Sequence, residues 1–234
     1  MFYGVNIDPG HYVDPDELAA QIAGSGFTWV RSVLKWDVPF DLWLLACHAH
    51  SLRTLIVVAR ESLVADGSFE RTARAVATIY KDDVTAFQIG NEADHIGPSS
   101  WTMPGAELTR LGAAFRSAMP DATLICAGMA DGRPEYLDDV DLSVFDAIGV
   151  HGYGRRPNDT EDWAELPGNF GTIGALLDEY ARFGKPIYMS EIGVTTDEVS
   201  EAFQARYAAA MVAEVSKRSD VEALFWFCYS DLMA

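Results

Sequence analysis

The chain has 234 residues, and its 35 acidic and 17 basic side chains give a formal net charge of −18 at pH 7. This charge argues against nucleic-acid backbones and anionic membranes as partners, whereas a neutral polymer or a small neutral ligand fits it better. Hydrophobic residues make up 49% and charged residues 22%, as in one soluble globular domain over residues 1–234, and no apolar run approaches the ~18 residues of a membrane span.

Eight short apolar, β-branched or aromatic runs predict β-strands, and longer runs with helical periodicity lie between them. The predicted strands are Phe2–Ile7, Thr28–Leu34, Thr54–Ala59, Ala86–Ile89, Thr123–Ala127, Ala147–Val150, Ile187–Ser190 and Ala223–Cys228. The predicted helices are Pro15–Ala23, Asp41–His50, Phe69–Tyr80, Ala106–Met119, Arg133–Val140, Gly171–Phe183 and Ser200–Ser219. Capping residues support two of these helix starts, because Asp14 precedes Pro15 and Ser68 precedes Phe69.

The strict alternation of strands and helices predicts a parallel α/β sheet, and eight such units close naturally into a compact (β/α)8 TIM barrel. An open doubly wound sheet is the alternative, but the segment after the first strand lacks the G-x-G-x-x-G phosphate loop. The eighth outer helix is expected to be missing, because the sequence stops at Ala234 directly after the last strand. A longer natural chain, a partner or a shifted terminus could then cover the groove between the first and seventh helices; the oligomeric state stays open.

The N-terminus has no basic region followed by an apolar stretch, so no export signal is predicted. The compartment stays undetermined, because a signal peptide removed from the natural protein would leave the same sequence.

Catalytic side chains of such a barrel lie at the carboxyl ends of its strands. Two glutamates stand there, Glu92 after the fourth predicted strand and Glu191 after the seventh. Other polar and aromatic residues at these ends are candidates for binding a substrate: Arg31, Trp36, Arg60, Asn91, His151, Tyr153 and Trp226. No His, Cys and Asp cluster has the spacing of a zinc or di-metal site, so we expect no metal and no cofactor, although His151, Asp131 and Glu191 could be combined into one.

Strands four and seven lie across the barrel mouth from one another, so Glu92 and Glu191 can approach to the roughly 5 to 5.5 Å that double displacement on a glycoside needs. One carboxylate must attack the anomeric carbon while the other donates a proton to the departing oxygen. Arg31 and Tyr153 are candidates for hydrogen bonds that lower the pKa of the ionised partner. Asn91 is a candidate donor to the sugar 2-hydroxyl.

The pair Asn91-Glu92 at the end of strand four, with Glu191 at the end of strand seven, resembles clan A of the glycoside hydrolases. This 4/7 superfamily includes the cellulase-like family 5 and the xylosidase-like family 39. Arg31, the His151-Gly152-Tyr153 triplet and Trp226 resemble residues around the −1 subsite of these enzymes. The resemblance implies a retaining β-glycosidase acting on a polysaccharide or oligosaccharide, with Glu92 as acid/base, Glu191 as nucleophile and Tyr153 hydrogen-bonded to Glu191. The short predicted loops favour an open cleft and internal cleavage.

Other interpretations stay open. The barrel could be a metal-assisted hydrolase, a lyase or an inactive carbohydrate-binding protein, although Lys35 is the only lysine near a strand end that a Schiff-base lyase could use. Glu92 and Glu191 could be structural, His151 could be a core residue, and Arg60 could belong to an ion pair at the rim. The tryptophans predicted as sugar-stacking platforms, or else as core residues, are Trp36, Trp101, Trp163 and Trp226.

Overall fold

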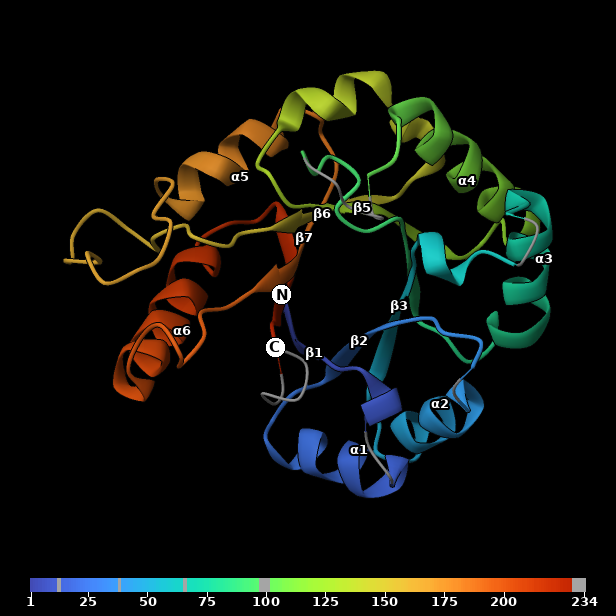
Figure 1. Ribbon diagram of the computed structural model, residues 1–234, viewed down its shortest axis with the longest axis horizontal. Coiled ribbons are helices and arrows are strands. Elements are labelled where there is room, and N and C mark those ends of the chain that lie inside the picture. The colour runs from blue at the N-terminus through green and yellow to red at the C-terminus, as the bar shows by residue number, and fades with distance from the viewer. Residues whose placement is uncertain (12–13, 38, 65–66, 97–101, 229–234) are drawn as a thin grey trace.

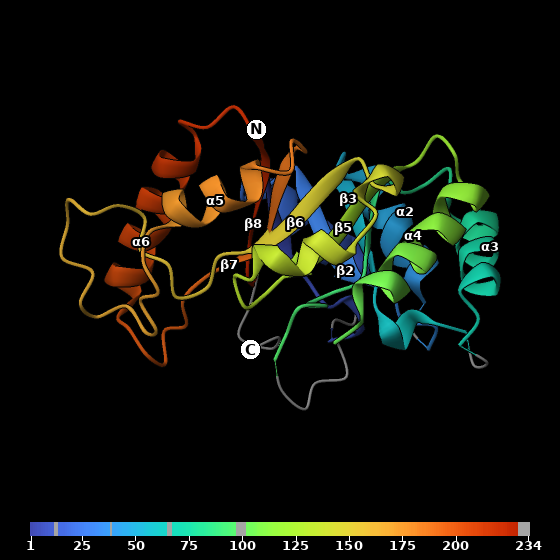
Figure 2. The same ribbon diagram turned by 90° about the horizontal axis from the view of Figure 1, so that it is seen from above.

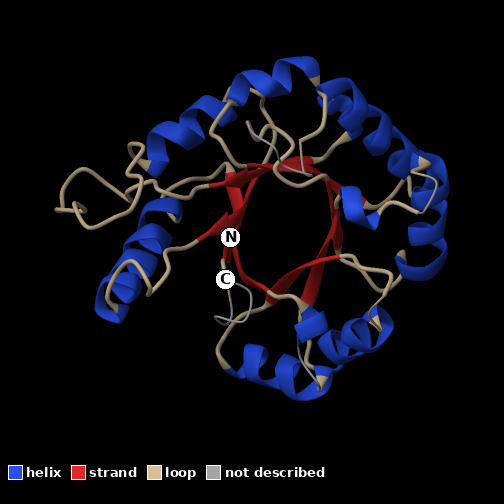
Figure 3. Ribbon diagram, viewed as in Figure 1, coloured by secondary structure: helices blue, strands red, loops and turns tan. Residues whose placement is uncertain are grey.

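The computed structural model describes residues 1–234 except 12–13, 38, 65–66, 97–101 and 229–234. Eight parallel strands form a closed barrel in which each pairs with its neighbour in the sequence and β8 pairs with β1 (Figures 1 and 3). The strands are β1 (Phe2–Asn6), β2 (Trp29–Val33), β3 (Arg53–Val58), β4 (Ala86–Ile89), β5 (Thr123–Met129), β6 (Ala147–His151), β7 (Ile187–Ile192) and β8 (Val221–Trp226). The predicted (β/α)8 barrel is therefore confirmed, and the open sheet is excluded.

The described helices form a ring around the outside of the barrel (Figures 1 and 3). The α-helices are α1 (Pro15–Gly24), α2 (Phe40–Ala49), α3 (Phe69–Tyr80), α4 (Gly105–Ala118), α5 (Ile173–Ala181) and α6 (Glu201–Val215), and the 3-10 helices are η1 (Pro9–His11), η2 (Arg60–Ser62), η3 (Pro134–Asp139) and η4 (Leu142–Val144). Both predicted caps form: the Asp14 side chain accepts from the first amides of α1, and the Ser68 side chain accepts from Arg71 N of α3.

The predicted α-helix over 133–140 is wrong, because this segment forms the 3-10 helix η3 and leads into a second short turn, η4. Only Pro134 and Leu137 of η3 are buried, so the segment offers too small an apolar face to stabilise an α-helix by packing. A short connector of this kind commonly takes the tighter 3-10 form.

No helix follows β8 in the part of the chain that is described, which ends at residue 228. The ring of helices is therefore open between α6 and α1 (Figure 1), in agreement with the predicted absence of the eighth outer helix. None of the described helices is long and apolar enough to cross a bilayer.

Side chains fill the inside of the barrel below its mouth. The buried residues of this inner layer are Trp29, Leu55, Ala86, Ile125, Ala147, Tyr188, Ala223 and Phe225. Gly4 makes room for the Phe225 ring, because a Cβ at Gly4 would lie 2.4 Å from it. Side chains alternate along a strand, so Arg31 lies on the same face as Trp29, one step closer to the carboxyl end. The polar side chains of the site therefore lie next to this buried apolar layer, toward the carboxyl ends of the strands.

Candidate active site

Glu191 on β7 has both carboxylate oxygens hydrogen-bonded, although the residue is only 7% exposed. Arg31 Nη1 donates to Glu191 Oε1 at 2.6 Å, and the Tyr153 hydroxyl donates to Oε2 at 2.7 Å. Burial alone raises the pKa of the Glu191 carboxyl, but the interactions with His151, Arg31 and Tyr153 outweigh it and hold that pKa below its ordinary value. The site therefore favours an ionised Glu191.

Arg31 is a buried cation on β2, and all three of its guanidinium nitrogens donate to polar side chains on or after other strands of the barrel. Its Nε donates to Gln88 Oε1 at 3.1 Å on β4, and Nη1 donates to Asn6 Oδ1 at 2.6 Å on β1 as well as to Glu191. Its Nη2 donates to Asn91 Oδ1 at 2.7 Å. A buried charge is tolerated when it is paired and fully hydrogen-bonded, so this arrangement fixes the guanidinium beside the carboxylate.

Glu92 follows β4 in a left-handed backbone conformation, with φ of +47°, which a residue with a side chain rarely adopts. Its backbone N donates to Gly128 O on β5 at 2.7 Å, which ties this strained residue to the neighbouring strand. The side chain is 26% exposed, far more than that of Glu191 at 9%. Glu92 is therefore the more accessible of the two glutamates from the mouth of the barrel.

The loop that carries Glu92 is fastened by Asp94, which is 2% exposed. The Asp94 carboxylate accepts from the backbone N atoms of Ala130 at 2.7 Å and Asp131 at 3.2 Å, directly after β5. Burial raises the pKa of Asp94 more than these hydrogen bonds lower it.

Sequence reasoning missed Asp94 and Gln88, because neither stands at a strand end and their partners lie on or after other strands.

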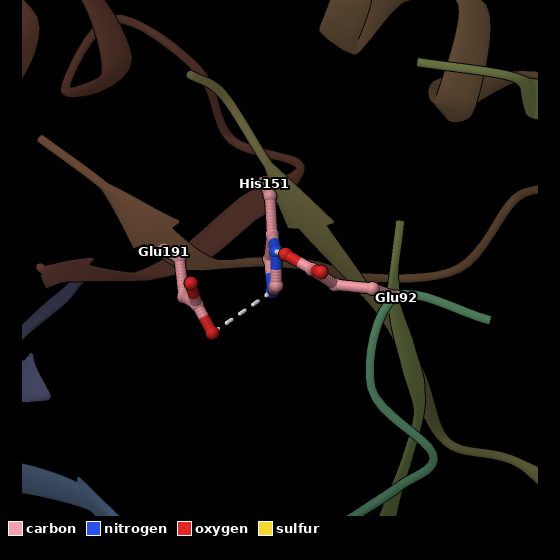
Figure 4. A group of neighbouring side chains, drawn as sticks. All are labelled: Glu92, His151 and Glu191. Atoms are coloured by element: carbon pink, nitrogen blue, oxygen red, sulfur yellow. Dashed lines mark hydrogen bonds and ion pairs between the residues drawn. The ribbon is translucent and has the colours of Figure 1, made fainter. Parts of the chain in front are cut away.

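His151 at the end of β6 lies between the two glutamates (Figure 4). Its Nδ1 is 3.2 Å from Glu92 Oε1, and its Nε2 is 3.5 Å from Glu191 Oε1. The ring packs against the backbone of β5, since a Cβ at Gly128 would lie 2.0 Å from His151 Nε2. With Tyr153 edge-on at 6.1 Å between ring centroids, the imidazole has little freedom to turn away.

One carboxylate oxygen of Glu92, one of Glu191 and a His151 ring nitrogen all lie within 4.8 Å of one another. This donor set fits a resident metal ion poorly, because the Arg31 guanidinium and the Tyr153 hydroxyl already bind the two Glu191 oxygens. The arrangement suits hydrogen bonding and proton transfer between the three side chains.

The structure brings Arg31, Asn91, Glu92, His151, Tyr153 and Glu191 together. Trp226, half-buried at the end of β8, borders the same cavity as His151 and Tyr153.

Two predicted binding residues lie apart from this group. Trp36 is 40% exposed after β2, and its Nε1 donates to Ser62 O at 2.8 Å. Arg60 begins η2 and lies 3.6 Å from Glu107 of α4 in an ion pair. Substrate contact by either residue therefore stays a prediction.

The remaining tryptophan predictions have different outcomes. Trp163 is 2% exposed and packs edge-on against Phe203 and Tyr207, so it is a core residue and not a stacking platform. Trp101 lies outside the described residues. Lys35, the candidate for a Schiff-base lysine, forms an ion pair with Asp8 at the rim.

A cavity of about 1160 Å³ opens from this group over the carboxyl ends of β5 to β8. His151, Tyr153 and Trp226 line its inner part, and the loops after β6 and β7 line its outer part. This volume exceeds the 300 to 1,000 Å³ of ordinary small-molecule sites, so it has room for more than one sugar ring. His151 and Tyr153, which contact the two glutamates, thus border an open cleft.

Comparison with protein-family models and with curated proteins finds no match. Among solved structures, the chain is similar to a family 39 glycoside hydrolase from Bacteroides cellulosilyticus WH2, with a TM-score of 0.74 and 18% identity over 97% of this chain and 56% of that one. It also resembles the catalytic domain of the major endoglucanase from Xanthomonas campestris pv. campestris (TM-score 0.66, 14% identity, 97% of this chain and 85% of that one).

A GH30 endoxylanase from Clostridium papyrosolvens C71 matches with a TM-score of 0.67 and 14% identity over 97% of this chain and 64% of that one. Of the family 39 structure, with 56% of its length covered, the chain spans little more than half. At these identities the likeness is one of fold, and at that level the resemblance to clan A glycoside hydrolases is confirmed.

Proposed function

We propose that the protein is a retaining β-glycoside hydrolase that cleaves a neutral polysaccharide or oligosaccharide, with Glu191 as nucleophile and Glu92 as acid/base. The observation that carries this proposal is the pair of carboxylates with oxygens within 4.8 Å and with different surroundings. Inverting enzymes hold their carboxyl groups roughly 6.5 to 9.5 Å apart to admit a water, whereas retaining enzymes need the shorter separation. The fold shared with the glycoside hydrolases described above supports the same conclusion.

In the first step, Glu191 attacks the anomeric carbon while the bond to the departing oxygen breaks. Glu92 gives its proton to that oxygen, so the leaving group departs as a neutral alcohol and a glycosyl ester forms on Glu191. Glu191 suits the attacking role, because its pKa is lowered and the Arg31 and Tyr153 hydrogen bonds hold its orientation. Glu92, more exposed, suits the side from which the alcohol leaves.

In the second step, a water molecule attacks the anomeric carbon of the ester, and Glu92, now ionised, takes a proton from it. The bond to Glu191 breaks and the carboxylate returns to its ionised form. Two inversions at the anomeric carbon leave the product with the configuration of the substrate. No external acid, base or oxidant is consumed, so the cycle balances with water as its only co-substrate.

His151 links the two glutamates through a contact with Glu92. Its Nδ1 lies 3.2 Å from Glu92 Oε1, whereas Nε2, at 3.5 Å from Glu191 Oε1, forms no hydrogen bond with any described residue. An imidazole nitrogen can accept from a carboxyl group or donate to a carboxylate, so the Nδ1 contact is compatible with both forms of Glu92 that the two steps require.

Asn91 is held in one orientation, because its Oδ1 accepts from Arg31 Nη2 at 2.7 Å and from Gln88 Nε2 at 3.3 Å. Its amide nitrogen is then the group it can offer to a ligand, as a hydrogen-bond donor. A sugar bound between the carboxylates has its 2-hydroxyl next to the reacting carbon, where such a donor stabilises the oxocarbenium-like transition state.

The alternatives fit the site less well. A Schiff-base lyase would need an amine free to react, whereas Lys35 is paired with Asp8. A metal-assisted hydrolase would have to displace Arg31 from Glu191. An inactive carbohydrate-binding barrel would have no need to hold Glu92 in a strained left-handed backbone conformation near the ionised Glu191.

The test is a screen of the protein on β-1,4-linked glucan, mannan, xylan and galactan with detection of new reducing ends. We expect hydrolysis of at least one of these glycans, unaffected by EDTA, and no turnover by Glu191→Gln. Glu70→Gln, an exposed change at the start of α3, is the matched control and should retain wild-type activity. Full activity of Glu191→Gln, or loss of activity with EDTA, would overturn the proposed function.

A further inference from the structure

A long loop, residues 152–172, connects β6 to α5 and forms the outer wall of the cleft. It extends away from the barrel beside α5 and α6, as the amber trace at the left of Figures 1 and 2 shows. The short loops expected from the sequence therefore have an exception here. Long loops without secondary structure in a compact domain are usually functional.

Hydrogen bonds hold both ends of this loop together at the cleft. Phe170 N donates to Gly154 O at 2.7 Å, and Phe170 O accepts from the Arg155 guanidinium. Arg156 N donates to Gly171 O at 2.9 Å, and the Tyr207 hydroxyl of α6 donates to Arg155 O at 2.8 Å. The backbone around Phe170 is therefore fixed to the start of the loop, and through Arg155 O to the buried Tyr207 of α6, before any ligand arrives.

The Phe170 ring rests on glycine backbone and leaves most of its surface to solvent. A Cβ at Gly154 would lie 2.8 Å from the ring, and one at Gly168 would lie 2.7 Å from it. Both glycines have positive φ, so neither position readily accepts another residue. Phe170 is nevertheless 68% exposed. A phenyl ring that is held in place yet uncovered has apolar area available for a ligand.

Phe170 lines the same cavity as His151 and Tyr153, which contact the two catalytic glutamates. The cavity of about 1160 Å³ therefore extends from the side chains that contact the two glutamates to this ring. The segment after β7 and the first residue of α6 line the same cavity with the exposed polar side chains of Thr196, Glu198 and Glu201. A cavity lined by an apolar ring and by hydroxyl and carboxylate groups matches a pyranose, which has C–H faces and a rim of hydroxyls.

The charges of the cleft favour a neutral sugar. Its cations are already engaged, because Arg155 donates to Phe170 O, and Arg133 donates to Asp94 O at 3.2 Å and to Glu135 at 3.2 Å. Glu198 and Glu201 add negative charge to a chain that already carries −18. A uronic acid or sulfated sugar would be repelled there, whereas neutral hydroxyls can donate to these carboxylates.

We propose that Phe170 and the 152–172 loop form a distal subsite that binds a neutral pyranose unit of the substrate chain, away from the ring cleaved between Glu92 and Glu191. The inference rests on the proposed function and extends it to a substrate of several linked sugars. Stacking on an aromatic face strengthens binding of every substrate long enough to reach Phe170, and it leaves the binding of a single sugar unchanged.

The kinetic test compares Phe170→Ala with wild type on an aryl β-glycoside of one sugar and on the β-1,4-tetrasaccharide of the same sugar. Loss of one stacking contact should lower kcat/KM for the tetrasaccharide about fivefold and leave that for the aryl glycoside unchanged. Phe170→Trp should keep the preference for the tetrasaccharide, and Leu45→Ala, an exposed change on α2, should alter neither rate. Equal losses on both substrates, or no loss on the tetrasaccharide, would overturn the subsite.

A binding test separates this inference from the proposed function. Glu191→Gln, with and without Phe170→Ala, is titrated calorimetrically with cellotetraose, mannotetraose and xylotetraose. Weaker binding of one tetrasaccharide only in the double variant supports the subsite, even if wild type hydrolyses none of them and the proposed activity fails. Equal affinities in the two variants, or binding of no tetrasaccharide by either, overturn the subsite whatever the turnover result.

Discussion

Replacing Tyr153 by Phe removes one of the two donors to the Glu191 carboxylate and nothing else of comparable size. The hydroxyl donates to Oε2 at 2.7 Å, while Arg31 continues to hold Oε1. Glu191 stays buried after the change, so Oε2 loses a hydrogen bond that bulk water cannot fully replace. The ionised form of Glu191 is thereby destabilised, and its protonated form is much less affected.

The size and sign of the effect follow from this contact. A hydrogen bond to a charged group contributes about 1.5 to 3 kcal/mol, and one pKa unit corresponds to about 1.36 kcal/mol, so the pKa of Glu191 should rise by roughly one to two units. The folded-state pKa of Glu191 is held below its ordinary value by these interactions, and the change moves it back up. The nucleophile then becomes protonated at a higher pH, and the acidic limb of the kcat/KM profile moves upward.

The assay is a pH profile of kcat/KM on an activated aryl β-glycoside, which needs little proton donation from Glu92. Burial and the Glu191 charge hold the pKa of Tyr153 well above its usual range, so ionisation of this phenol does not enter the acidic limb. Tyr3→Phe is the control, since its hydroxyl lies 3.2 Å from Ser216 Oγ, near the amino ends of the strands. An acidic limb that stays in place or moves to lower pH in Tyr153→Phe would refute the reasoning.

Further variants test the other parts of the site. Glu92→Ala should slow the hydrolysis of glycosides with poor leaving groups by at least about a hundredfold, and that of dinitrophenyl glycosides far less. An equal loss on both kinds of glycoside would exclude Glu92 as the general acid. Gly128→Ala should displace His151, because the new Cβ would lie 2.0 Å from His151 Nε2, and kcat should fall by about tenfold or more. Gly24→Ala is the control and should leave kcat unchanged, because a Cβ at Gly24 has no neighbouring atom within 4 Å. Asp94→Asn should lower the free energy of unfolding by about 1 to 3 kcal/mol, because one of the two half-buried backbone N–H groups loses its carboxylate acceptor. An unchanged denaturation midpoint would contradict this.

The barrel and the placing of Glu92 and Glu191 at its mouth could be predicted from local patterns. Apolar runs such as Ile187–Ser190 read as strands whatever their neighbours are, and counting them placed Glu92 and Glu191 on opposite sides of the mouth. Arg31 was found because it lies on the second predicted strand, among the polar residues near the carboxyl ends of the strands. These signals are local in the sequence, and the closed order of strands converts them into positions in space.

The rest of the site depends on contacts between distant segments. Arg60 stands at a strand end, yet the turn of η2 places it beside Glu107 of α4. Asp94 and Gln88 carry no local signal, because their roles arise from the amides after β5 and from the guanidinium on β2.

Phe170 also has no local signal in the sequence, where it is one aromatic residue in a loop. Only the contact of its ring with Gly154 and Gly168 distinguishes it from an ordinary surface residue.

The configuration of the first product formed tests the double displacement most directly. Proton NMR spectra recorded in the first minutes of hydrolysis of the best β-glycan, before mutarotation, distinguish the two anomers. With carboxylate oxygens within 4.8 Å at Glu92 and Glu191, we expect the β-anomer to appear first and the α-anomer to grow only later. Initial release of the α-anomer would contradict the nucleophilic role of Glu191.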